Sequence, residues 1–149
     1  MKRRRLQLTK GHRLTLYAFS LILLLSGAAW AWMHRLDEAG GTNDAWRNLK
    51  PWLLRIHGLG APFFVLLVGT LLPGHVRRSW HASKNRANGA FFLTTIALLT
   101  LSGYALYYLG DEEWRRFTSQ FHLWLGLGAP LLLLAHVLIG RRATRARDS

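Results

Sequence analysis

The chain has 149 residues, half of them hydrophobic, and its 20 Lys and Arg against 7 Asp and Glu give a formal net charge of +13. It contains no cysteine, which excludes disulfides, iron–sulfur clusters and a c-type haem attached through C-x-x-C-H. The length predicts a single domain, and the apolar residues come in long blocks, which predicts membrane spans instead of a soluble core.

Four apolar blocks are each long enough to cross a bilayer about 30 Å thick, which takes roughly 20 helical residues. We expect helices at about 14–33, 52–72, 89–109 and 118–139. The predicted fold class is therefore all-α, a four-helix integral membrane bundle that occupies residues 1–149 as one domain. The first segment also resembles a signal peptide, but its apolar run continues through Trp30 and Trp32, which favours a retained first helix.

The connections between the spans are short. Segment 34–50 is polar and is expected to form a loop on the outer side, and Pro51 is expected to open the second helix in its first turn. The second helix meets Pro73-Gly74, where we expect a break near the inner surface. The second and fourth helices share the segment G-L-G-A-P, at 58–62 and 126–130, whose small residues favour close helix approach.

The basic residues are distributed unevenly between the two sides of the membrane. The termini and the connection between the second and third spans hold 14 Lys and Arg against one acid, Asp148, whereas the other side holds 6 basic residues, counting Arg55 near the start of the second span, and 6 acidic residues. Because short basic loops stay in the cytoplasm, both termini are predicted to be cytoplasmic, in a bacterial inner membrane. This topology accounts for the charge without nucleic-acid binding.

Four histidines lie in the second and fourth apolar segments. His57 and His75 are 18 residues apart, and His122 and His136 are 14 apart, so the two members of each set lie near one face of their helix. His57 and His122 are close to the outer boundary, and His75 and His136 are close to the inner one. The spacing predicts an outer and an inner pair. The other histidines are expected to be solvated in polar flanks: His12, His34 and His81.

Two imidazoles from facing helices can bind one haem iron inside an apolar bundle, so the two pairs predict two non-covalent haem b groups. Small residues one turn from the ligands would leave room for the porphyrin: Gly60, Gly126 and Gly140. Basic residues near both ends are candidates to pair with haem propionates: Arg55, Arg115 and Arg116 outside, and Arg77, Arg78, Arg141 and Arg142 inside. No Asp or Glu lies within the spans, which disfavours a proton or ion transporter.

The segments LLRIHGLG (53–60), SGYALYY (102–108) and FHLWLGLGAPLLLLAHVLIGRR (121–142) resemble the four-helix membrane cytochrome b superfamily. Its members include the b-type subunits of respiratory hydrogenases and formate dehydrogenases. The resemblance covers the second to fourth helices, and its most specific element is the His-x13-His of the fourth. It implies electron transfer between a redox partner at the outer face and a quinone or partner near the inner face.

The resemblance further implies association with lipid and with other subunits of a redox complex, such as a periplasmic cytochrome or oxidoreductase. It implies no bond-making catalysis by the chain itself. The 18-residue spacing of His57 and His75 departs from the family pattern. His75 is still preferred to His81 as the inner ligand, because His81 lies about 120° away from the face of His57.

Two alternatives remain open from the sequence. The first is a haem-free membrane anchor or assembly subunit whose histidines pack or bind a metal. The second is a mono-haem cytochrome that uses only His57 and His122.

Overall fold

The computed structural model describes residues 9–41, 43–77 and 86–145, without the side chains of His75 and of residues 141–145. This part of the chain is helical throughout, with elements α1 (Lys10–Glu38), α2 (Asp44–Gly69), a short π-helical turn η1 (Leu72–Val76), α4 (Arg86–Tyr108) and α5 (Glu112–Arg145). Each of the four long helices has the length and apolar composition needed to cross a membrane. The predicted all-α class and its four potential spans are therefore confirmed.

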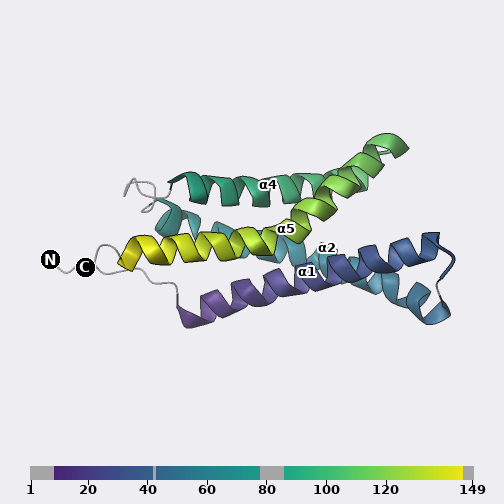
Figure 1. Ribbon diagram of the computed structural model, residues 1–149, viewed down its shortest axis with the longest axis horizontal. Helices are drawn as coiled ribbons and strands as arrows, with labels where there is room; N and C mark the ends of the chain where they lie inside the picture. Colours follow the sequence, from purple (N-terminus) through teal and green to yellow (C-terminus); the bar gives the residue numbers. More distant parts are fainter. Residues whose placement is uncertain (1–8, 42, 78–85, 146–149) are drawn as a thin grey trace.

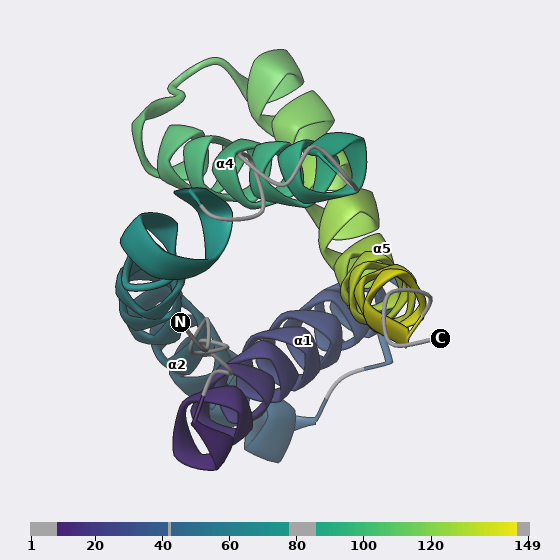
Figure 2. The ribbon, with the colours of Figure 1, turned by 90° about the vertical axis from the view of Figure 1, so that its left-hand side faces the viewer.

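The four long helices surround a common axis in the order α1, α2, α4, α5 (Figure 2). α1 packs mainly along α2, and α4 packs mainly along α5, with fewer contacts between the two hairpins. Consequently α2 and α5 stand diagonally across the bundle from each other. The first turn of α1 and the last turns of α5 lie at the same end of the molecule (Figure 1).

The helices extend beyond the apolar blocks from which they were predicted. Segment 34–50, predicted to be a loop, is mostly helical, and α2 already begins at Asp44. Asn43 caps this start, because its side-chain oxygen accepts a hydrogen bond of 3.1 Å from the Trp46 backbone N–H. The prediction that Pro51 opens the second helix is therefore wrong, and Pro51 lies inside α2.

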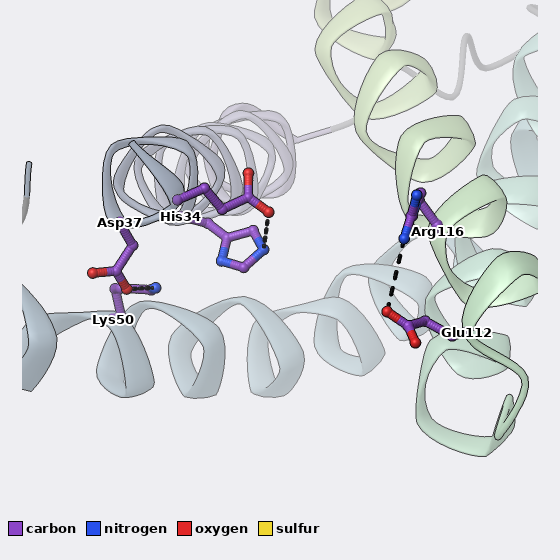
Figure 3. Close-up of polar contacts among 6 residues, drawn as sticks. His34, Asp37, Lys50, Glu112 and Arg116 are labelled. Carbon is purple, nitrogen blue, oxygen red and sulfur yellow. Dashed lines mark hydrogen bonds and ion pairs between the residues drawn. The ribbon is translucent and has the colours of Figure 1, made fainter. Parts of the chain in front are cut away.

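The ends of α1 and α2 next to the turn that connects them are joined by an ion pair. The Asp37 carboxylate on α1 accepts from the Lys50 ammonium on α2 (Figure 3). Both side chains are largely covered, with 29% and 17% of their surface exposed, so this pair helps to fix the hairpin where the apolar blocks have ended. The other pairs drawn lie within single helices: His34–Glu38 and Glu112–Arg116.

The inner end of α2 is interrupted as the sequence predicts. α2 ends at Gly69, and in η1 the Val76 N–H donates to the Leu71 carbonyl, five residues back, at 3.2 Å. This spacing makes a wider turn than an α-helix, and it contains Pro73, which has no N–H to donate. The predicted break at Pro73-Gly74 is confirmed.

The interior of the bundle is not closed by apolar packing. Among the described residues no hydrophobic side chain is buried; the buried positions are Ser26, Gly60, Thr95 and Ser102. Gly60 allows α2 to approach α1 closely, since a Cβ there would lie 3.3 Å from Leu23 Cδ2. Two of the three buried hydroxyls contact histidines, and these contacts define the site.

Candidate functional site

His57 on α2 and His122 on α5 meet across the bundle. Their ring centroids are 6.1 Å apart, and the ring planes are inclined by 78°. The two residues belong to α2 and α5, the diagonal helices of the bundle (Figure 2), so their contact joins the two hairpins. The structure thus brings together the two histidines that the sequence assigns to the outer pair.

Helix α1 orients the imidazole of His57. The His57 Nδ1 atom lies 3.0 Å from the Leu23 carbonyl oxygen and 3.2 Å from Ser26 Oγ. Because a carbonyl can only accept, Nδ1 must carry the proton. Ser26 donates its own proton to the Ile22 carbonyl at 2.6 Å, so its oxygen presents a lone pair to the ring. The lone pair of His57 is therefore on Nε2, the nitrogen available to a metal.

Helix α4 orients His122 in the same way. Ser102 Oγ lies 2.8 Å from His122 Nδ1 and donates its proton to the Leu98 carbonyl at 2.7 Å. The serine oxygen is thus left to accept the Nδ1 proton of His122. This arrangement again leaves the lone pair on Nε2.

A glycine follows each of these serines and makes room for the ring. A Cβ at Gly27 would lie 2.9 Å from His57 Cε1, and one at Gly103 would lie 3.3 Å from His122 Cε1. The sequence carries a signal for this arrangement that the histidine spacing does not reveal: L-x-L-S-G occurs in α1 at 23–27 and again in α4 at 99–103. In both copies the serine bonds the ring and the glycine lets the ring approach the helix.

The ring centroids of His57 and His122, 6.1 Å apart, lie at a separation at which two opposed imidazoles can bind one metal ion. Imidazole nitrogens bind such metals at about 2.0 Å, which places opposed ring centroids about 6 Å apart. Within the described ranges, no cluster of three or more His, Cys, Asp and Glu could hold a metal ion. Two histidines are the set that a bis-histidine haem takes from its protein, whereas a structural zinc site takes four ligands.

The inner layer contains His136, which is also held by α4. Its Nδ1 lies 3.2 Å from Asn88 Nδ2, and its ring stacks on Phe92 with centroids 5.1 Å apart and planes 16° apart. Turning the amide over would present Asn88 Oδ1 as an acceptor for an Nδ1 proton. The imidazole of His75, predicted to oppose His136, lies outside the described part of the structure.

Helix α4 supplies a polar side chain to each histidine of α5, Ser102 to His122 and Asn88 to His136. Asn88 and Ser102 are 14 residues apart, as are His136 and His122, so the two helices match in level at both layers. On α1, the residue that lies 14 positions before Ser26 is His12, the third residue of that helix.

His12 is a third histidine at the level of the inner layer. It lies 14 residues, or about 21 Å, before Ser26, which places it near the level of His136. The side chain is half-buried, and its Nε2 lies 3.4 Å from Thr70 Oγ1 on α2. Sequence reasoning placed His12 in a polar flank; the structure includes it in the first turn of α1, against α2.

The glycines predicted to flank the haems occupy different surroundings. A Cβ at Gly60 would contact Leu23 of α1, and one at Gly126 would lie 3.7 Å from Leu99 Cδ2 of α4, so both face the partner helix of their own hairpin. A Cβ at Gly140 would meet no described atom within 4 Å.

Of the arginines predicted to pair with propionates, Arg115 and Arg116 lie near the start of α5, and Arg55 lies inside α2. The Arg55 guanidinium sits 4.8 Å from the centroid of the Trp52 ring, two residues from His57. Arg77 is exposed next to η1. The side chains of Arg78, Arg141 and Arg142 lie outside the described residues.

The chain matches no protein-family model, no curated protein and no solved structure.

Proposed function

We propose that the chain is a multi-pass membrane cytochrome that carries electrons by means of haem bound between histidines of its bundle. The observation that carries the proposal is the His57–His122 pair. Both imidazoles direct Nδ1 to a partner on the neighbouring helix, which leaves both Nε2 lone pairs for a metal. Their centroid separation of 6.1 Å is about the distance that one iron between them requires.

The interior of the bundle supports a bound group of this kind. A bundle of helices normally fills its axis with close-packed side chains. Here no described hydrophobic residue is buried, although the helices are apolar enough to span a membrane. Haem bound there would supply one-electron redox chemistry at its iron.

The two layers of histidines give the proposed electron path its length. His122 and His136 are separated by about 21 Å along α5, most of the thickness of a bilayer core of about 30 Å. We assign the outer layer to His57 and His122, and the inner layer to His136 with one further histidine. The level of His12 matches that of His136, whereas His75 lies beyond the end of α2, in the turn η1, 18 residues after His57. The geometry therefore favours His12 over His75 as the second inner ligand.

The charge distribution and the resemblance to four-helix membrane cytochromes b complete the proposal. Both termini are cytoplasmic in a bacterial inner membrane. A redox protein or subunit docks at the outer face, and a quinone or second partner exchanges electrons near the inner face. The chain transfers electrons without making or breaking bonds in a substrate.

The proposal is tested by measuring haem in the purified protein. We expect about two non-covalent b haems per chain, extractable into acidified organic solvent because the chain has no cysteine for thioether attachment. A ratio near zero would contradict the proposal and favour a haem-free anchor subunit. A ratio near one would favour the mono-haem alternative.

Single substitutions then assign the outer site. His57→Ala and His122→Ala should each lower the haem content to about one per chain. His34→Ala serves as the matched control, because His34 stacks on Trp30 and pairs with Glu38 at the outer end of α1. It should retain both haems.

A further inference from the structure

We infer that Ser26 and Ser102 are positioning residues that orient the two outer ligands and lower the reduction potential of the outer haem alone. This inference rests on the proposed function. It concerns two hydroxyls that share three properties: both are buried, both donate to their own helix, and both present a lone pair to a histidine of the next helix.

The burial of these serines is the first step. Ser26 and Ser102 have 5% and 7% of their surface exposed, in a bundle that buries no described hydrophobic residue. A serine in an apolar helix can satisfy its hydroxyl with its own backbone alone, and Ser20 and Thr100 do so through Leu16 and Ile96. Contact with an imidazole is therefore an additional feature of Ser26 and Ser102.

The direction of the hydrogen bonds is the second step. The proton of each serine is directed to a backbone carbonyl, at 2.6 Å for Ser26 and 2.7 Å for Ser102. Each serine oxygen then accepts from Nδ1–H and fixes the tautomer that exposes Nε2. A hydrogen-bond acceptor at Nδ1 makes an imidazole that binds a metal through Nε2 a stronger electron donor, which favours ferric over ferrous iron.

The orientation of the rings is the third step. His57 is tied to α1 and His122 to α4, and the resulting planes are inclined by 78°. Each hairpin therefore sets the rotation of its own ligand. Each ring also has a backbone carbonyl partner, Leu23 for His57 and Leu99 for His122, but Ser102 makes the closer serine contact, at 2.8 Å against 3.2 Å for Ser26. Loss of Ser102 should have the larger effect.

The test compares Ser102→Val with Ser102→Thr in the full-length haem-loaded protein. Valine and threonine have nearly the same shape, so the two variants differ in the hydroxyl. In Ser102→Val we expect the ferrous-to-ferric ratio of the outer haem to rise by up to about tenfold at a given potential, a shift of about 59 mV for one electron. Ser102→Thr should stay near the wild-type potential, and Ser26→Ala should shift in the same direction by less.

Two further readouts separate positioning from general packing. The low-spin ferric electron paramagnetic resonance signal of the outer haem, which depends on the angle between the ligand planes, should change in Ser102→Val and not in Ser102→Thr. The potential of the inner haem should not move in any of these variants. Thr100→Val removes a hydroxyl from the same helix without touching a histidine and should leave both haems unchanged.

The outcomes also separate this inference from the proposed function. A wild-type protein that contains no haem would contradict the proposed function itself. Wild-type protein with haem, but equal potentials and spectra in Ser102→Val and Ser102→Thr, would overturn the inference alone. If Ser102→Val lost the outer haem and Ser102→Thr kept it, the hydroxyl would be required as inferred. If both variants lost the outer haem, the site would require a small side chain at position 102, and the inference would be wrong.

Discussion

At the scale of single residues, the outer site depends on a serine and a glycine that are adjacent on one helix. Ser26 holds His57 through its oxygen, and Gly27 gives the same ring space against α1. Ser102 and Gly103 repeat this arrangement for His122. Hydrogen bonding and close approach must act together, because a ring that is pushed away from the helix cannot keep its bond to the serine.

Gly27→Ala should displace the imidazole of His57. The added Cβ would lie 2.9 Å from His57 Cε1 and 3.1 Å from Nδ1, closer than such atoms can approach. Partners that orient a metal ligand typically contribute about 10–100-fold to metal affinity, so we expect haem affinity at the outer site to fall at least about tenfold. Titration of the apoprotein with haem measures this loss, and the inner site should be unaffected.

Substitutions of two other glycines serve as the comparison and the control for that experiment. Gly103→Ala should weaken the outer site less, because its Cβ would lie 3.3 Å from His122 Cε1. Gly69→Ala should leave haem binding unchanged, since a Cβ there meets no atom within 4 Å. Equal affinities for Gly27→Ala and Gly69→Ala would show that α1 does not constrain His57.

At the scale of the elements, the sequence predicts the spans well and their ends poorly. A bilayer imposes a minimum length on an apolar helix, so the four blocks are visible without any knowledge of contacts. The ends depend on particular contacts instead: the cap at Asn43 and the Asp37–Lys50 pair extend helices into a segment predicted as a loop. The break at Pro73-Gly74 was predictable because proline lacks the donor that an α-helix requires.

The candidate site was predictable to a similar degree. Depth and helix direction are sufficient to pair His57 with His122. The roles of Ser26 and Ser102 were not predictable from the same reasoning, because a membrane serine usually bonds its own helix and only packing reveals which histidine it also faces. His12 was expected to be solvated because it is surrounded by charged residues in the sequence, whereas its level on α1 follows from helix rise alone.

The choice of the second inner ligand is a prediction about elements. The level of His12 on α1 matches that of His136, so His12→Ala should lose the inner haem and keep the outer one. His75→Ala should keep both haems, because His75 lies beyond the end of α2, in the π-helical turn. His136→Ala gives the spectrum of the outer haem alone, against which both variants are compared.

The reverse result would also have a clear meaning. If His75→Ala lost the inner haem and His12→Ala did not, the sequence prediction of His75 would be correct. The turn at Leu72–Val76 would then bring that side chain back to the level of His136. The outer pair would stand in either case, because His57 and His122 contact each other directly.

At the scale of the whole molecule, the bundle is built from two hairpins that make few contacts with each other. Each hairpin contributes one histidine to the outer pair and orients it with its own serine. Neither hairpin therefore contains a complete site, and a group bound between His57 and His122 would also join the two halves. We expect haem binding to stabilise the bundle as a unit, because a ligand that binds only the assembled state favours that state.

The predicted orientation of the molecule rests on charge, and the absence of cysteine from the sequence allows a direct test. Gly41 lies in the turn between α1 and α2, Gly110 lies between α4 and α5, and Gly11 lies in the first turn of α1; all three are exposed. Because the basic segments are predicted to stay in the cytoplasm, Gly41→Cys and Gly110→Cys should react with a membrane-impermeant maleimide in intact spheroplasts. Gly11→Cys should react only after the membrane is permeabilised. If only Gly11→Cys were labelled in intact spheroplasts, the predicted orientation would be reversed, and the outer and inner layers would be exchanged. If Gly41→Cys and Gly110→Cys were labelled differently, the prediction of four membrane spans would be contradicted.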